Sequence, residues 1–272
     1  MKQTEEIKVH AWIENLQANG KNAFALEVLE KELPSYSAIA LKRALNRLSE
    51  KGNIISVFKG YYLIITPQYS SKGILPVYLY IDGLMKHLDR QYYIGLLNAA
   101  AFHGASHQQA QEFFVFTLLP VLRPTQKKGQ KINYISISEI NPNFLIDIKT
   151  EMGYLKVSNP ILTATDLIQF EKKIGGLNRA ATVLEELAEK IDIEQITNEI
   201  INRVPVTTWQ RLGFILESIL EQKEIANTIF QKLQEHQKML YRIPLKASGA
   251  KNNFETNERW KISINTTIET DF

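Results

Sequence analysis

Residues 35–64 read SYSAIALKRALNRLSEKGNIISVFKGYYLI, and their pattern predicts the architecture of the N-terminal part of the chain. Its first half predicts a helix, because apolar residues recur at helical spacing. The stripe consists of Leu41, Leu45 and Leu48. Ser35 or Ser37 is a suitable N-cap, and Gly52 is a suitable C-terminal stop. The second half predicts a β-hairpin, because β-branched and aromatic residues flank a Lys-Gly turn.

Two shorter helices are expected before this stretch. Apolar residues on one face of 7–18 predict the first, and the segment NGKNAF breaks it. The leucines of ALEVLEKEL predict the second, which Pro34 ends. Three helices followed by a hairpin are the element order of a winged helix-turn-helix. We therefore expect such a DNA-binding domain over residues 1–70.

The charge of 35–64 is lopsided, since five basic residues stand against Glu50 alone, a net of +4. In a helix-turn-helix, the second helix of the pair enters the major groove with its N-terminal half nearest the bases. Arginine can pair with guanine and asparagine with adenine, while hydroxyls and helix N-termini contact phosphate. Residues predicted to contact double-stranded DNA are Ser35, Tyr36, Ser37, Lys42, Arg43, Asn46, Arg47 and, at the hairpin tip, Lys59. Two alternatives stay open: a solvated amphipathic helix, and a winged module that contacts a protein.

Composition narrows the class of protein. The chain has 272 residues, 44% hydrophobic and 22% charged, which are ordinary globular values for two domains. The absence of cysteine excludes disulfides, thiolate catalysis and Cys-ligated zinc. No run approaches the ~20 apolar residues of a membrane span, and the N-terminus lacks a signal-peptide pattern. We expect a cytoplasmic protein with no membrane partner.

Residues 77–272 predict a larger, mixed α and β domain, so the fold class is α+β. The segment SSKGILP, at 70–76, is expected to be a linker or a bend. EFFVFTLLP, KINYISISEI, GYLKVS and the tail RWKISINTTIE predict strands. LNRAATVLEELAEKI, TTWQRLGFILESIL and EIANTIFQKLQEHQK predict helices. Trp209 and Phe214 are expected in the core, while Arg211 could pair with an acid or lie at an interface.

A basic loop is expected at RPTQKKGQK. It is either a solvated tip or a surface that meets an acidic partner. Its possible partner-contact residues are Arg123, Lys127, Lys128 and Lys131.

Motifs for catalysis, metals and cofactors are weak. His103 and His107 lie four apart, as in H-E-x-x-H, but Gly104 occupies the Glu position, so packing is the favoured role. Gly175 and Gly176 are expected to cap a helix rather than bind phosphate. Asp166 is expected in the first turn of a helix, not in a catalytic pair. With no P-loop or dinucleotide fingerprint, we predict no catalytic residue, no metal and no cofactor.

The chain resembles the AbiEi-type antitoxins, which are transcriptional regulators of type IV toxin–antitoxin systems linked to abortive phage infection. The resemblance is carried by the N-terminal element order, by GILPVYLYIDGLMKHLDRQYYIGLLNAAAFHGASHQQAQEFFVFT, by GYLKVSNPILTATDLIQF, and by GGLNRAATVLEELAE and WQRLGFILE. It extends to about residue 220.

The resemblance implies two tasks. The N-terminal domain would bind inverted repeats in the promoter of its own operon and repress it. The C-terminal domain would counter a nucleotidyltransferase-like toxin, with no stable complex implied and no enzymatic activity. The alternative is a winged-helix regulator whose C-terminal domain binds a ligand or a protein, with no toxin.

Overall fold

The computed structural model describes residues 8–105, 111–248 and 254–269. The chain divides into two compact units. One consists of the described residues through Tyr93 together with Gln111–Ile140 and Asp147–Lys156. The other consists of residues 94–105, Asn141–Ile146 and the described residues from Val157 onward. This division interleaves segments of the chain, so it does not test the single boundary that the sequence predicts at 70–77. That boundary stays a prediction.

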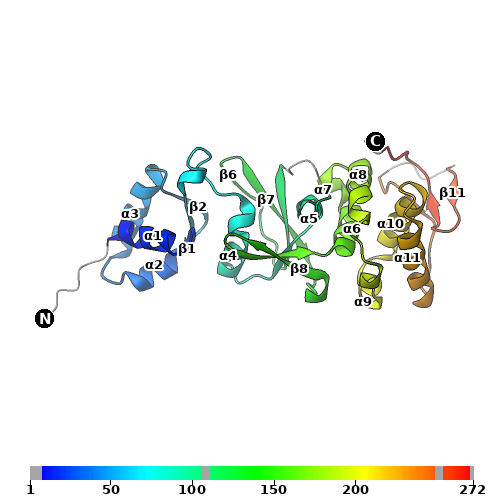
Figure 1. Ribbon diagram of the computed structural model, residues 1–272, viewed down its shortest axis with the longest axis horizontal. Coiled ribbons are helices and arrows are strands. Elements are labelled where there is room, and N and C mark those ends of the chain that lie inside the picture. The colour runs from blue at the N-terminus through cyan, green and yellow to red at the C-terminus, as the bar shows by residue number, and fades with distance from the viewer. Residues whose placement is uncertain (1–7, 106–110, 249–253, 270–272) are drawn as a thin grey trace. The chain divides into compact units, whose positions relative to one another are not determined.

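The first unit begins with three helices and a three-stranded sheet (Figure 1). The helices are α1 (Val9–Ala18), α2 (Leu26–Glu32) and α3 (Ala38–Glu50), and the strands are β1 (Ala23–Ala25), β2 (Ile54–Phe58) and β3 (Tyr61–Ile64). The sheet is antiparallel with order β1-β3-β2. The predicted helices and hairpin are therefore present. Strand β1 was not predicted, because three residues are too few to show an alternating pattern.

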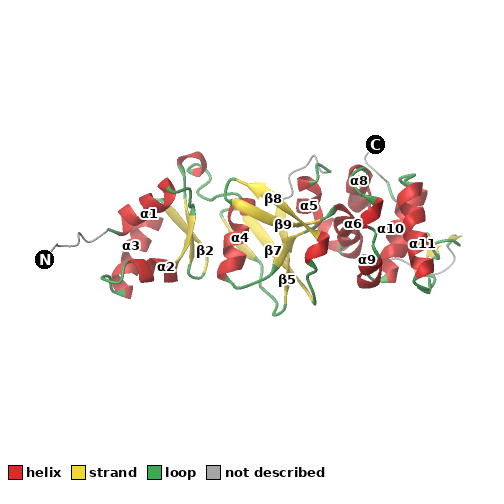
Figure 2. Cartoon of the chain, turned by 60° about the horizontal axis from the view of Figure 1, so that its bottom comes forward, coloured by secondary structure: helices red, strands yellow, loops and turns green. Residues whose placement is uncertain are grey.

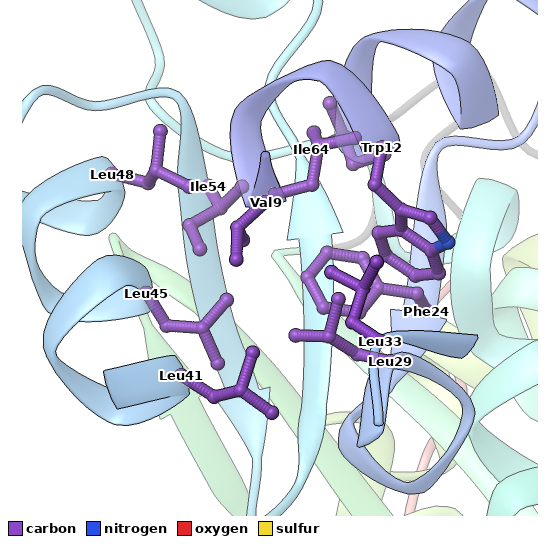
Figure 3. Packing of buried hydrophobic residues seen from close by; sticks show 11 residues of the cluster. Val9, Trp12, Phe24, Leu29, Leu33, Leu41, Leu45, Leu48, Ile54 and Ile64 are labelled. Carbon is purple, nitrogen blue, oxygen red and sulfur yellow. The ribbon is translucent and has the colours of Figure 1, made fainter. Parts of the chain in front are cut away.

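A single apolar cluster holds these elements together (Figure 3). Trp12 of α1 packs edge-on against Phe24 of β1, with ring centroids 5.3 Å apart. The predicted stripe of α3 is buried here, since Leu41, Leu45 and Leu48 are 1%, 2% and 9% exposed. Contacts of this kind, more than intrinsic helix propensity, hold short helices in place.

The segment after β3 is not a free linker. A 3₁₀ turn at Pro67–Tyr69 leads into Ile74 and Leu75, which are 2% and 0% exposed. Helix α4 (Val77–His87) follows. The segment 70–76 is therefore a bend with a buried end, which its polar beginning SSKG does not reveal.

A six-stranded sheet has the order β6-β7-β5-β4-β9-β8 (Figure 2). Its strands are β4 (Tyr92–Ile94), β5 (Glu112–Leu118), β6 (Thr125–Lys127), β7 (Gln130–Ile137), β8 (Leu145–Thr150) and β9 (Gly153–Ser158). The predicted strands EFFVFTLLP, KINYISISEI and GYLKVS are β5, β7 and β9. Strands β5 and β7 pair in parallel along their length, while β6 and β7 form an antiparallel hairpin.

The second unit is mainly helical. Its helices are α5 (Leu96–Phe102), α6 (Pro160–Gln169), α7 (Glu171–Ile174), α8 (Leu177–Ala188), α9 (Asn198–Arg203), α10 (Val206–Ser218) and α11 (Lys223–Glu235), with 3₁₀ turns at Pro142–Phe144 and Ile193–Gln195. The predicted helices α8, α10 and α11 are confirmed. In the described ranges, no helix is both long and apolar enough to cross a membrane.

The C-terminal segment is anchored by side chains more than by strands. The predicted tail strand is short: β12 (Ile262–Ser263) pairs with β10 (Ile243–Pro244) and β11 (Thr256–Asn257). Trp260 is fully buried, and its indole N–H donates to Glu217 of α10 at 2.6 Å. The Gln210 amide donates to the carbonyls of Tyr241 and Trp260, both at 2.8 Å.

Candidate nucleic-acid interface

Helix α3, the predicted recognition helix, is defined at both ends by its own sequence. Ser37 is the N-cap, and its hydroxyl oxygen accepts from the amide of Ala40 at 3.2 Å. This bond satisfies one of the backbone donors that a helix N-terminus leaves free. After Lys51, Gly52 adopts a left-handed φ of 74° and stops the helix.

The face of α3 opposite the leucine stripe is exposed and basic. Lys42, Arg43, Asn46 and Arg47 are all exposed. None of the three cations forms an ion pair with any carboxylate of the described residues. No acid stands in the first turn either, so the positive charge of this face is not neutralised by the chain itself. Such a surface attracts polyanions, and its attraction weakens with salt.

One predicted contact residue at the start of α3, Tyr36, differs from expectation. Tyr36, predicted to face outward, is half-buried and packs against the apolar cluster. The reason is its place in the turn between α2 and α3, where its amide donates to the carbonyl of Leu33 at 3.1 Å. Ser37 is exposed but already serves as the cap, while Ser35 is exposed.

One exposed residue of this face was not among the predicted contacts. Ile39 is 66% exposed in the first turn of α3. Its side chain has no charge and no hydrogen-bonding group, so the charge pattern of the sequence does not indicate it. The signal that could have found it is spacing, because Ile39 precedes Arg43 by four residues and so shares its face.

The β2–β3 turn is short and held in place. Lys59 is exposed, and Gly60 has a φ of 73° that glycine adopts without strain. The amide of Leu26 donates to the Gly60 carbonyl at 2.8 Å, and Nε2 of His87 lies 3.4 Å from the Lys59 carbonyl. The turn backbone is therefore fixed to α2 and α4, and only the Lys59 side chain projects.

The predicted basic loop at 123–131 contains a β-hairpin. Lys127 ends β6, Lys128 lies in the turn with a φ of 46°, and both are exposed, as is Arg123. Lys131 is not in the turn: it lies in β7 and pairs with Glu112 of β5 at 2.7 Å. Hydrogen bonds from Lys131 and from Asn133 lower the pKa of the Glu112 carboxyl. The loop expectation was wrong because a charged two-strand hairpin lacks the apolar alternation that marks strands.

An exposed apolar tip precedes this hairpin. Leu119 and Val121 are 65% and 68% exposed. The Arg90 guanidinium donates to the carbonyls of Leu118 and Pro120 at 2.8 and 2.9 Å, so the tip is held rather than free.

The histidine and glycine motifs of the second unit have structural roles. Nε2 of His103 lies 2.8 Å from the Ser158 carbonyl, and burial lowers the pKa of His103. His107 lies outside the described residues, and within them no group of three acidic or histidine side chains could hold a metal. Gly175 is left-handed at the end of α7, and Gly176 precedes α8, which confirms the predicted cap.

Asp166 does not lie in a first turn. Helix α6 begins earlier, at Pro160, because Asn159 caps it by accepting from the Leu162 amide at 3.0 Å. Asp166 is 5% exposed in the middle of this helix. The signal in the sequence for this earlier start is the Asn159-Pro160 pair, an N-cap followed by a proline at N1.

The α10 residues Trp209 and Phe214 are buried, as predicted. Arg211 lies beside a cavity of about 430 Å³ that Lys172, Leu177 and Leu245 also line. Its guanidinium donates to the Pro244 carbonyl at 3.2 and 3.3 Å. Burial lowers the pKa of Arg211, and nearby Glu171 opposes that shift. Arg211 therefore contacts the C-terminal segment of its own unit.

Comparison with known proteins assigns the central part of the chain. Among curated proteins, none matches the sequence. The crystal structure of the RV2827C protein from Mycobacterium tuberculosis has a similar fold, with a TM-score of 0.67 at 14% identity, over 92% of this chain and 89% of that one. The family of AbiEi antitoxin C-terminal domains matches residues 93–218. The match confirms the resemblance seen in the sequence, and residues 93–218 of this mixed α and β protein are an AbiEi-type antitoxin domain.

Proposed function

We propose that this protein is the antitoxin of a type IV toxin–antitoxin system and that it also binds and represses its own promoter. The AbiEi-type domain over residues 93–218 supports the first task. The second is supported by the N-terminal part, in which three helices, a hairpin and the added strand β1 follow the order of a winged helix-turn-helix.

The observation that carries DNA binding is the outer face of α3. Its cations are exposed and unpaired among the described residues, while the inner leucines are almost completely buried. A helix fixed by one face and cationic on the other suits insertion into the major groove. Arg43 and Asn46 would then contact base edges, while Lys42 and Arg47 contact base edges or phosphates.

Outside α3 the proposed interface is small, because the β2–β3 turn is short and does not form a long wing. Lys59 contributes a single side chain next to the backbone of the duplex, because its turn is fixed to α2 and α4. Ser35 and the amides at the start of α3 contact phosphate. Tyr36 packs against the apolar cluster below this end of the helix, and Ser37 caps it.

The antitoxin task needs no catalysis and no cofactor. We propose that the protein acts in the cytoplasm and counters a nucleotidyltransferase-like toxin encoded beside it, without a stable complex. Repression of the shared promoter at inverted repeats then couples the amount of antitoxin to the expression of the operon.

The DNA-binding part is tested with a double variant of α3. The promoter fragment upstream of the gene should bind the full-length protein, with affinity that falls steeply as salt rises. Arg43→Ala/Arg47→Ala should weaken binding by roughly 1–3 kcal/mol for each lost base contact. Fluorescence anisotropy at several salt concentrations measures both effects.

The matched control is Arg179→Ala/Lys190→Ala, which removes two exposed cations from α8 and the turn after it. It should bind like the wild type. Equal loss in both double variants would mean that binding follows total charge and that α3 is not the recognition helix.

A second candidate function is a regulator whose larger part binds another protein. The apolar tip at Leu119 and Val121 favours it, since rigid exposed apolar residues beside cations are common at protein contacts. Arg123, Lys127 and Lys128 would meet acids of that partner. A neighbouring gene that encodes no toxin, together with a partner whose binding is lost in Leu119→Ser/Val121→Ser, would favour this function over the first.

A further inference from the structure

The side chain that projects furthest from the first turn of α3 is apolar. Ile39 is 66% exposed, whereas its neighbours Ala38 and Ala40 end at Cβ. The hydroxyl of Ser37 is turned toward the amide of Ala40 as the helix cap. Whatever approaches this turn of the helix therefore meets the butyl group of Ile39 before it meets any other side chain of the turn.

Ile39 lies on the basic face. Lys42, Arg43 and Asn46 follow it by three, four and seven residues, so all four side chains share one side of the helix. On an ordinary protein surface, a single exposed isoleucine does not indicate a binding site. Here it stands at the N-terminal end of a cationic helix, which is the end that comes nearest to the bases when such a helix enters the major groove.

We infer that Ile39 determines operator specificity by packing against the methyl group of a thymine. This inference rests on the proposed DNA binding and names what the first turn of α3 reads. The thymine C5-methyl is the apolar group that base pairs present in the major groove. The isoleucine side chain has no hydrogen-bond donor or acceptor. Against any other base edge it would form no hydrogen bond, and the polar groups of that base would stay unpaired.

The position of this thymine follows from helix geometry. Four residues separate Ile39 from Arg43, which is roughly 6 Å along the helix axis. Base pairs are stacked at about 3.4 Å. The thymine is therefore expected within about two base-pair steps of the base pair that Arg43 contacts, in each half of the inverted repeat.

The test removes the methyl group without changing base pairing. After footprinting locates the site on promoter DNA, each thymine is replaced singly by deoxyuridine, and dissociation constants are measured with the full-length protein. For the wild type, replacing one particular thymine in either half-site should weaken binding roughly fourfold, because the contact with one methyl-sized group is lost. For Ile39→Ala, the same replacement should have no effect, because the contact is already lost.

Two further variants sharpen the comparison. Val28→Ala trims an apolar side chain that is 45% exposed on α2, and it should keep the wild-type response to every replacement. Ile39→Val keeps most of the apolar contact and should keep part of the response. Since both sites are exposed, the thermal unfolding midpoints should stay within a few degrees of the wild type.

The outcomes separate the two proposals. If the wild type binds no promoter fragment, the proposed DNA-binding function fails. If the wild type binds but Ile39→Ala responds to every deoxyuridine as the wild type does, only the thymine contact is overturned. Unchanged DNA affinity combined with lost toxin neutralisation in Ile39→Ala would also overturn it and would assign Ile39 to a protein contact.

Discussion

Gly213 shows how one residue fixes the C-terminal segment to helix α10 of the same unit. It lies inside α10, where glycine is unfavourable by about 1 kcal/mol relative to alanine. A Cβ at this position would overlap the ring carbons of Trp260. The ring is held there by the hydrogen bond to Glu217 and by the edge-on contact with Phe230, at a centroid distance of 5.3 Å. The close approach of the Trp260 indole thus explains why α10 has glycine, a residue of low helix propensity, at position 213.

Gly213→Ala is therefore expected to destabilise the protein despite its better helix propensity. Displacing the indole should cost roughly 1–3 kcal/mol, as overpacking generally does. The thermal midpoint of the second unit, followed by circular dichroism, should fall by several degrees. Thr207→Ala, at an exposed position of the same helix, should leave it nearly unchanged. A midpoint equal to the wild type in Gly213→Ala would mean that Trp260 does not rest on this glycine.

At the scale of elements, the sequence predicts those whose own pattern buries them. Helix α3 was predicted together with its core face, because Leu41, Leu45 and Leu48 follow the helical period. Strands β1 and β6 were missed because each has three residues and is held by its partners β3 and β7. The tail was predicted as a longer strand than β12, because packing of Trp260 rather than strand pairing holds it.

The candidate nucleic-acid interface likewise contains some features that the sequence predicts and others that it does not. The exposed cations of α3 could be predicted, because charge and helical spacing are both local properties of the sequence. The half-buried position of Tyr36 and the fixed β2–β3 turn could not, since Tyr36 packs against a cluster assembled from several elements and the turn is held by His87, which is distant in sequence. Ile39 shares the spacing of the cations but lacks their charge.

The cap of α3 allows helix stability and the proposed DNA binding to be separated. Ser37→Ala removes the acceptor for the Ala40 amide and should destabilise the N-terminal part by about 1 kcal/mol. Ser37→Asp keeps a good cap and suits the helix dipole, so stability should be retained. The new carboxylate would face phosphate, so promoter binding should weaken in Ser37→Asp. Urea unfolding and fluorescence anisotropy on the same samples measure the two effects; full promoter affinity in Ser37→Asp would contradict a phosphate at this end of α3.

At the scale of the whole molecule, charge is concentrated rather than spread. Residues 35–64 carry +4, while the complete chain carries +3, so the other residues together carry −1. Attraction to a polyanion thus depends on local clusters of cations: one lies at the β6–β7 hairpin, with Arg123, Lys127 and Lys128, and the other lies on α3 and the β2–β3 hairpin. The AbiEi-type domain begins at residue 93, after α3 and the β2–β3 hairpin. The two proposed tasks therefore rest on different residues and should be separable by mutation.

Arg43→Ala/Arg47→Ala in the full-length protein should abolish repression but keep neutralisation. Expressed from an inducible foreign promoter beside the toxin gene, the variant should restore growth as well as the wild type does. A reporter driven by the native promoter should be repressed by the wild type and not by the variant, because only the base and phosphate contacts of α3 have been removed. Immunoblotting ensures equal protein amounts. Loss of growth rescue at wild-type abundance would show that the cationic face of α3 also takes part in countering the toxin, and the division into two tasks would then be wrong.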